Sequence, residues 1–271
     1  MAGNDNMRLA ERLLQPIQNA GRAIMQHYER GAEYTLKDDA SPVTAADHDS
    51  EKIILEALAE AVPDLPVVSE ESAPEAPSTK PAPRFVLVDP LDGTKEFISK
   101  QADFTVNVAV IDNGTPCFGI VYAPASSEFY YTPAPDRAVR VRLDPFGPTA
   151  AVSDLAGQDL RTREPAASGL TAVASRSHLN DATLHYLDEL GVTEIARAGS
   201  SLKFCRIAEG AADVYPRLAP TMEWDTAAGH AVLAAAGGAV LDQDGAALSY
   251  GHADRNFTNP SFIAWGRAPR R

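Results

Sequence analysis

Residues 85–94 have the sequence Phe85-Val86-Leu87-Val88-Asp89-Pro90-Leu91-Asp92-Gly93-Thr94. The first four residues are apolar, which is typical of a buried β-strand. Two aspartates, at positions i and i+3, then leave the end of that strand in a turn that contains a glycine. Hard divalent cations such as Mg²⁺ prefer oxygen ligands and are often bound through carboxylates together with phosphate oxygens. The stretch therefore predicts a site for a metal ion and a phosphate group.

Other acidic residues also fall where a predicted element begins or ends. Glu70 and Glu71 follow a short predicted strand over residues 67–69. If that strand lies beside residues 85–88, the carboxylates at the two strand ends converge. Asp225 opens an alanine-rich predicted helix, whose N-terminal dipole favours an anion. Considered in isolation, an aspartate at a helix start such as Asp225 is more often an N-cap than a metal ligand.

Asp47 has two compatible explanations. The sequence Thr44-Ala45-Ala46-Asp47 is typical of a capping box, with the acid in the third helical position. An acid held at a helix N-terminus stays ionised, which also suits a residue that orients or deprotonates an attacking water.

The composition excludes several classes of protein. The chain has 271 residues, of which 45% are hydrophobic and 23% are charged, and a formal net charge of −13. We therefore expect no nucleic-acid partner, because no basic face is available to neutralise a phosphate backbone. The two cysteines are too few for a disulfide framework or a zinc cluster, and we expect reduced thiols. The polar N-terminus has no signal-peptide core, and no run approaches the ~18 apolar residues of a membrane span, so we expect a cytoplasmic protein.

The first half of the chain predicts two helices packed on an antiparallel or mixed sheet. The helices cover residues 7–30 and 44–62, with Pro16 inside the first. The predicted strands are 67–69, 85–88, 104–111, 117–122, 127–131 and 138–142. Residues 143–169 are rich in Pro, Gly, Ala and Ser, and we place the boundary between two halves, 1–150 and 151–271, within them.

The second half alternates strands and helices, which favours an α/β arrangement. Its predicted strands are 171–174, 193–197, 212–215, 239–242 and 261–265. Its predicted helices are 181–190, 201–209 and 225–236, with Asn180 and Ser200 as N-caps of the first two.

Several common phosphate and metal motifs are absent from the sequence. It contains no Gly-x4-Gly-Lys-Ser/Thr loop and no Gly-x-Gly-x-x-Gly fingerprint after a strand. The haloacid-dehalogenase phosphatases need two aspartates at i and i+2, whereas Asp89 and Asp92 are at i and i+3. Asp242-Gln243-Asp244-Gly245 lacks the glutamate that ends a calcium loop, and we expect a surface turn there.

Three motifs together resemble a known family. Glu70-Glu71-Ser72, the segment 89–94 and Trp224-Asp225-Thr226-Ala227-Ala228-Gly229 are similar to the signatures of the lithium-sensitive, Mg²⁺-dependent phosphatase superfamily that includes inositol monophosphatase. They occur in the family's order, and the resemblance covers almost the whole chain. It implies an α-β-α-β-α layered sandwich of the inositol monophosphatase/fructose-1,6-bisphosphatase type, of the α+β or α/β class.

The resemblance also implies a ligand set. Two or three Mg²⁺ ions would be held by Glu70, Asp89, Asp92, Asp225 and the carbonyl of Leu91. Asp47 and Thr94 would position and activate the attacking water, and Glu71 would lie beside the site without being a principal ligand.

Within this superfamily the chain most closely resembles the 3′(2′),5′-bisphosphate nucleotidases of bacterial sulfur assimilation. Four segments carry that resemblance: Thr94-Lys95-Glu96-Phe97-Ile98, Ser175-Arg176-Ser177-His178, Gly199-Ser200-Ser201-Leu202-Lys203-Phe204 and Tyr215-Pro216-Arg217. It implies that the substrate is a small phosphorylated nucleotide, contacted by Gly93, His178, Ser200, Lys203 and Arg217. Backbone N–H groups of residues 200 and 201 at a helix N-terminus would suit a phosphate, and the ordinary alternative is a serine N-cap beside solvated basic residues.

Three functions follow as hypotheses. The first is Mg²⁺-dependent hydrolysis of the 3′-phosphate of adenosine 3′,5′-bisphosphate, with the sulfated nucleotide as a candidate second substrate. The second is an inositol or other sugar monophosphatase, and the third is a non-catalytic metal and nucleotide sensor. The sequence leaves open a homodimer, peripheral contact with the inner membrane, and whether the proline-rich segment 72–83 is a mobile flap or a surface loop.

Overall fold

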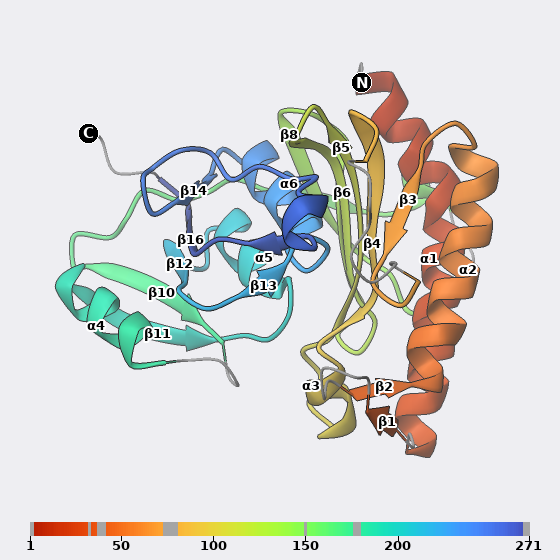
Figure 1. The fold of residues 1–271 in the computed structure, drawn as a ribbon, viewed down its shortest axis with the longest axis horizontal. Coiled ribbons are helices and arrows are strands. Elements are labelled where there is room, and N and C mark those ends of the chain that lie inside the picture. The colour runs from red at the N-terminus through yellow and green to blue at the C-terminus, as the bar shows by residue number, and fades with distance from the viewer. Residues whose placement is uncertain are drawn as a thin grey trace.

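The computed structural model describes residues 3–31, 34–36, 42–72, 81–148, 151–175 and 180–267, and its elements form five layers (Figure 1). Helices α1 (Gly3–Arg30) and α2 (Ala45–Ala61) form one outer layer and pack on a seven-stranded sheet. Helices α5 (Leu202–Ala208) and α6 (Ala227–Ala235) lie between that sheet and a five-stranded sheet. Helix α4 (Asp181–Glu189) covers the far side. The α-β-α-β-α sandwich expected from the sequence is confirmed.

The seven-stranded sheet is mixed. Its strand order is β3 (Val67–Ser69), β4 (Arg84–Asp92), β5 (Thr105–Asp112), β6 (Thr115–Ala123), β7 (Glu128–Ala134), β8 (Arg137–Arg142) and β9 (Gly157–Asp159). Strands β3 and β4 are parallel, whereas every other neighbouring pair is antiparallel. Strand β9 was not predicted, and it extends this sheet past residue 150.

The five-stranded sheet is also mixed. Its strand order is β11 (Val192–Arg197), β10 (Leu170–Ala174), β12 (Val214–Arg217), β16 (Phe262–Trp265) and β14 (Ala239–Asp242). Strand β10 is parallel to both of its neighbours, and β16 is antiparallel to both of its own. Helices connect the parallel strands, as the alternating pattern predicted.

The remaining elements are short. Strands β1 (Tyr34–Leu36) and β2 (Pro42–Thr44) pair with each other, as do β13 (Thr221–Met222) and β15 (Thr258–Asn259). Helix α3 (Thr94–Ile98) follows the aspartate turn and was not predicted. Single 3-10 turns cover Val152–Asp154 and Ala253–Arg255.

Strand β4 is buried on both faces, which explains its continuous apolar run. Val86 and Val88 pack in the cluster under α1 and α2, whereas Phe85 and Leu87 pack in the cluster under α5 and α6. Successive side chains of a strand point to opposite faces, so the strand needs apolar residues at every position. On the next strand but one, a Cβ at Gly119 would lie 2.5 Å from the carbonyl oxygen of Ala228, so a glycine is needed where α6 crosses the sheet.

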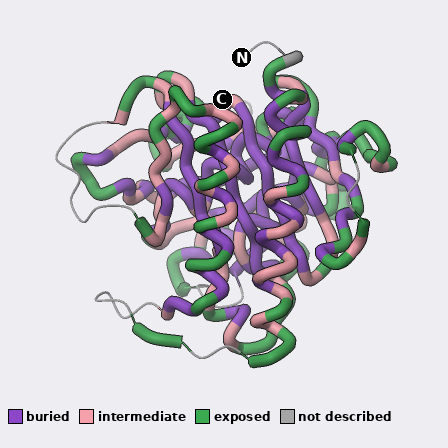
Figure 2. Tube along the Cα trace, turned by 90° about the vertical axis from the view of Figure 1, so that its right-hand side faces the viewer, coloured by how far each residue is buried: buried purple, intermediate pink, exposed green. Residues whose placement is uncertain are grey.

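The outer helices begin and end where the sequence predicted, with one extension. Helix α2 begins at a capping box in which Thr44 and Asp47 bind each other's backbone, and α1 continues through Pro16 and starts at Gly3 instead of residue 7. Exposed and buried positions alternate along these helices because only one face of each packs on the sheet (Figure 2). In the described part of the chain, no helix is both long and apolar enough to cross a membrane.

Candidate active site

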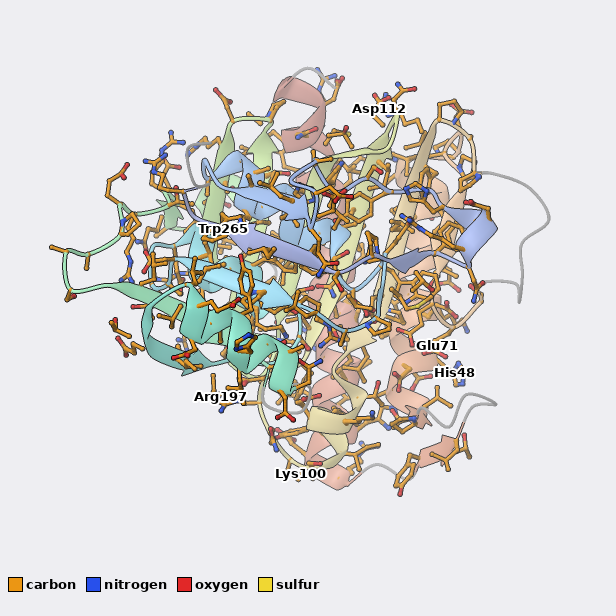
Figure 3. The ribbon with its side chains drawn as sticks, turned by 60° about the vertical axis from the view of Figure 1, so that its left-hand side comes forward. His48, Glu71, Lys100, Asp112, Arg197 and Trp265 are labelled. Atoms are coloured by element: carbon orange, nitrogen blue, oxygen red, sulfur yellow. The ribbon has the colours of Figure 1, made fainter. Side chains whose placement is uncertain are left out.

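The predicted convergence of the two strand ends occurs in the structure. Strands β3 and β4 run parallel, with Ser69 opposite Val88. The backbone N–H of Glu70 donates to the carbonyl of Val88 at 3.1 Å, which holds Glu70 beside the following Asp89. In Figure 3, Lys100 and Asp112 mark opposite ends of the molecule, and β5 runs from the end near Lys100 towards Asp112. The carboxylates lie where β4 ends and β5 begins.

A bulge explains the spacing of the two aspartates on β4. Asp89 lies opposite Asn107 and Asp92 lies opposite Thr105, so β4 has one extra residue between the two pairs. In a regular strand, residues three positions apart point to opposite faces. The extra residue in the bulge lets both carboxylates face the same site, and it also accommodates Pro90 within the strand.

Asp225 brings a carboxylate from the other half of the molecule to this strand end. Glu70, Asp89 and Asp225 each place one oxygen so that all three lie within 4.8 Å of one another. Asp225 does not cap α6, because the helix begins at Ala227 and the carboxylate Oδ2 instead accepts from Thr221 Oγ1 at 2.8 Å and Met222 N at 3.0 Å. The expected helix start at residue 225 is therefore corrected to 227.

Burial and mutual repulsion raise the pKa values of these carboxyl groups. Burial, then the charges of Glu70, Asp92 and Asp225, raises the pKa of Asp89 well above its ordinary value. Burial, followed by the charge of Asp225, raises the pKa of Asp92 to about 7, although nearby Lys203 opposes this. Burial, followed by the charge of Glu70, raises the pKa of Asp225 to about 6.

The chemistry of this donor set fits a hard divalent cation. Buried like charges disfavour their own ionised forms unless a positive charge compensates them. All of the donors are oxygens, which Mg²⁺ prefers over the nitrogen and sulfur ligands of softer metals.

Asp47 and Thr94 lie together beside the turn, and one oxygen of Asp47 is already fully used. Asp47 Oδ2 accepts from the N–H of Thr44 at 2.8 Å and from its hydroxyl at 2.6 Å. Asp47 Oδ1 accepts from Thr94 Oγ1 at 3.2 Å. The Thr94 hydroxyl also lies 3.3 Å from the carbonyl of Leu91. Burial is the main cause that raises the pKa of Asp47, and hydrogen bonds from Thr44 oppose it.

A cavity of about 350 Å³ opens over the carboxylates, and residues from both halves of the chain line it. Eight of the twelve residues expected in the site lie in its wall: Glu70, Asp92, Gly93, Thr94, Ser200, Lys203, Arg217 and Asp225. Asp47, Asp89 and Leu91 do not line this wall and are buried next to residues that do. His178 lies outside the described residues, as do positions 73–80 of the proline-rich segment.

The turn before α5 differs from the predicted serine cap. Ser201, and not Ser200, is the N-cap residue of α5. Ser200 has a left-handed backbone with φ of 48°, and its Oγ donates to the carbonyl oxygens of Asp92 at 2.7 Å and Asp103 at 3.0 Å. The N–H of Ser201 donates to Asp92 Oδ2 at 2.8 Å, so it is not a free donor for a phosphate. Gly93 has φ of 94° and lacks room for a Cβ, which would lie 2.5 Å from Ser200 Oγ.

Two cations face the cavity from the second half. Lys203 is buried and donates to the carbonyl of Ser200 at 2.6 Å, with its ammonium 5.3 Å from the centre of the Tyr215 ring. Burial lowers the pKa of Lys203 to about 8, although the charge of Asp92 opposes this. Arg217 donates one N–H to the carbonyl of Pro220, and its buried Nε has no hydrogen-bond partner among the described residues. These groups leave positive charge available for an anionic substrate.

Sequence reasoning missed residues that support the site. Thr221 holds the carboxylate of Asp225, and a threonine four positions before the aspartate was the only signal in the sequence. Glu96 is buried and lines the cavity, although we had considered it only as part of a motif. Glu71, expected to be a neighbour of the site, is half-buried and lies on the same side of the molecule as His48 (Figure 3).

Comparisons with known proteins identify the family of the chain. The sequence profile of the inositol monophosphatase family matches residues 5–266, so the chain belongs to that family. The chain is 43% identical to the 3′(2′),5′-bisphosphate nucleotidase CysQ of Salmonella typhimurium, across 94% of this chain and 98% of the relative. It is 42% identical to the CysQ nucleotidase of Escherichia coli K12 with the same coverage.

Solved structures show the same fold. CysQ from Bacteroides thetaiotaomicron, described as a bacterial member of the inositol monophosphatase family, superposes with a TM-score of 0.77 at 34% identity and covers 96% of this chain and 97% of its own. An inositol monophosphatase of Thermotoga maritima superposes with a TM-score of 0.70 at 22% identity, covering 93% and 90%. The second likeness concerns the fold alone.

Proposed function

We propose that this protein is a metal-dependent phosphatase that removes the 3′-phosphate of adenosine 3′,5′-bisphosphate and releases AMP and phosphate. The observation that carries the proposal is the buried cluster of Glu70, Asp89 and Asp225 beneath a cavity that also contains Lys203 and Arg217. The sequence identity to nucleotidases over nearly the full chain supports the same substrate.

The acidic residues would hold two or three Mg²⁺ ions. Glu70, Asp89 and Asp225 can share one ion, and Asp92 with the carbonyl of Leu91 extends the oxygen donors along the same turn. Mg²⁺ held by these residues would supply a lower pKa for a bound water and positive charge opposite the transferred phosphoryl group.

Asp47 and Thr94 would orient the attacking water. Because Asp47 Oδ2 is occupied by Thr44, Oδ1 is the oxygen that remains to direct the Thr94 hydroxyl. The water oxygen forms a bond to phosphorus while the bond from phosphorus to the ribose 3′ oxygen breaks. The Thr94–Asp47 pair accepts the proton of the water, and the leaving oxygen is protonated from solvent in the open cavity.

The cationic wall favours a nucleotide with a second phosphate over an inositol phosphate. Lys203 supplies a point charge, and Arg217 supplies a planar fork whose Nε is unpaired among the described residues. His178, Ser200 and Gly93 complete the proposed substrate contacts. The hydroxyl of Ser200 is bonded to backbone carbonyls, so its part is to shape the cavity wall.

A side-by-side assay of phosphate release tests the proposal. We expect purified protein with Mg²⁺ to hydrolyse adenosine 3′,5′-bisphosphate with a much higher kcat/KM than inositol 1-phosphate. A preference for inositol 1-phosphate would favour the sugar phosphatase, and nucleotide binding without turnover would favour the sensor. Lithium inhibition is expected for either enzyme.

We also propose a reducing, cytoplasmic setting. Cys117 and Cys205 are free thiols, and Cys205 is fully buried. Disulfides persist mainly in oxidising compartments, so two unpaired cysteines suit a reducing one. Peripheral contact with the inner membrane and a homodimer remain predictions.

A further inference from the structure

Ser201 is placed between two carboxylate residues that come from opposite halves of the chain. Its N–H donates to Asp92 Oδ2 at 2.8 Å, and Asp92 ends β4 of the first sheet. Its Oγ donates to the carbonyl oxygen of Asp225 at 2.6 Å, and Asp225 precedes α6. The side chain is buried and does not line the cavity, whereas the neighbouring Ser200 does. Ser201 is therefore not part of the cavity wall.

The hydroxyl of Ser201 is not used as a helix cap. Ser201 occupies the N-cap position of α5, where a serine oxygen normally accepts a backbone N–H of its own helix. Here the side chain makes no capping hydrogen bond. It donates to the carbonyl oxygen of Asp225 instead, so the hydroxyl connects α5 to the segment that precedes α6.

The backbone before Ser201 is held in an unusual turn that directs its N–H group towards Asp92. Ser200 adopts a left-handed backbone, which is uncommon for a residue with a Cβ. Gly199 packs against Asp103 so closely that a Cβ would lie 2.7 Å from its carbonyl oxygen, and the Gly199 N–H donates to Asp103 Oδ2 at 3.1 Å. Strained turns persist where the surrounding contacts determine them, and these contacts tie the turn to the first half of the chain.

We propose that Ser201 is a positioning residue that fixes the backbone of Asp225 relative to Asp92, so that the carboxylates of the two halves meet in one geometry. The proposal rests on the proposed function, because it assumes that these carboxylates bind Mg²⁺. The Asp225 side chain is separately held through Oδ2 by Thr221 and Met222. Ser201 adds a connection between the two halves, because it binds the backbone of Asp225 and the side chain of Asp92.

The test is the Mg²⁺ affinity of the full-length Ser201→Ala variant, measured by calorimetry without substrate. The substitution keeps the N–H bond to Asp92 and removes only the hydroxyl bond to Asp225. Loss of an interaction that orients a metal ligand typically weakens metal binding by at least about tenfold, and we expect a tenfold higher dissociation constant. Thr132→Val is the matched control, because it removes another buried hydroxyl, 2.9 Å from the N–H of Gly119 and on the far strand β7.

We expect both Ser201→Ala and Thr132→Val to lower the melting temperature, because each removes a buried hydrogen bond. Thr132→Val should leave the Mg²⁺ affinity unchanged. If the wild type hydrolyses the nucleotide and Ser201→Ala binds Mg²⁺ with the same affinity as the wild type, this inference is overturned and the proposed function is not. A wild-type protein that binds no Mg²⁺ would overturn the inference together with the proposed function. If Ser201→Ala does not fold, Ser201→Cys keeps the volume with a much weaker donor, and the same loss of affinity is expected.

Discussion

The two ends of helix α5 carry charges that are balanced in opposite ways. At the C-terminal end, Arg206 donates to Glu128 and to Glu209, each at 2.8 Å. At the N-terminal end, the described cations Lys203 and Arg217 face a larger group of carboxylates that includes Asp92 and Asp225. One end therefore pairs its charges with hydrogen bonds, and the other keeps an excess of negative charge.

The pKa values express the same difference. Burial acts to raise the pKa of Glu128, but the hydrogen bonds and charge of Arg206 outweigh it and lower that pKa below the ordinary value. Burial and neighbouring carboxylates raise the pKa of Asp92 to about 7. Burial is common to both regions, so burial alone does not mark a functional site. What distinguishes the N-terminal end is that the described carboxylates outnumber the described cations beside them, which favours a bound cation.

The largest effect should come from removing one charge at the unbalanced end. We expect Asp89→Asn to lower kcat about a thousandfold, equivalent to about 4 kcal/mol of activation free energy, because a metal-binding carboxylate is lost. Phosphate release from the bisphosphonucleotide at saturating Mg²⁺ measures this. Glu128→Gln is the control at the balanced end and should keep its turnover. Near wild-type activity of Asp89→Asn would contradict the claim that the carboxylates at the N-terminal end of α5 bind a catalytic metal.

The two cations of α5, Lys203 and Arg206, should differ in their effect on substrate binding. We expect Lys203→Met to raise the KM for the bisphosphonucleotide about tenfold, or about 1.4 kcal/mol, because the substrate loses a cationic partner in the cavity wall. Steady-state kinetics over a range of nucleotide concentrations measure the change. Arg206→Met, which removes a cation outside the cavity, should leave the KM unaltered. An unchanged KM for Lys203→Met would show that Lys203 serves only to offset Asp92.

The smallest effect should be on stability at the balanced end. We expect Glu128→Gln to lower the free energy of unfolding by about 1–2 kcal/mol, because Arg206 loses a charged partner in a partly exposed network. The Glu128 side chain is 20% exposed, so solvent screening keeps the loss below that of a fully buried pair. Urea unfolding at neutral pH measures the change. A Glu128 variant as stable as the wild type would mean that the network adds nothing to folding.

The convergence of the acidic residues could be predicted because it depends on local sequence. Apolar runs before Glu70 and Asp89 identify two strands, and parallel neighbours end at the same edge of a sheet. The layered fold followed from the resemblance to a family, and not from composition or periodicity.

Features that depend on pairing between distant segments could not be predicted. The bulge between Asp89 and Asp92 exists only in the register with β5. The left-handed conformation of Ser200 depends on acceptors at Asp92 and Asp103, which lie about one hundred positions earlier in the sequence. Asp225 looked like a helix cap because its real partner, Thr221, belongs to a two-residue strand with no periodicity to reveal it.

A Mg²⁺ titration of the metal-free protein by calorimetry tests the central claim most directly. The claim is that the excess negative charge of Glu70, Asp89 and Asp225 forms a metal site. We predict saturable binding in the wild type and in Glu128→Gln, and strongly weakened binding in Asp89→Asn. Absence of saturable binding in the wild type, or equal affinity in the wild type and Asp89→Asn, would contradict the account.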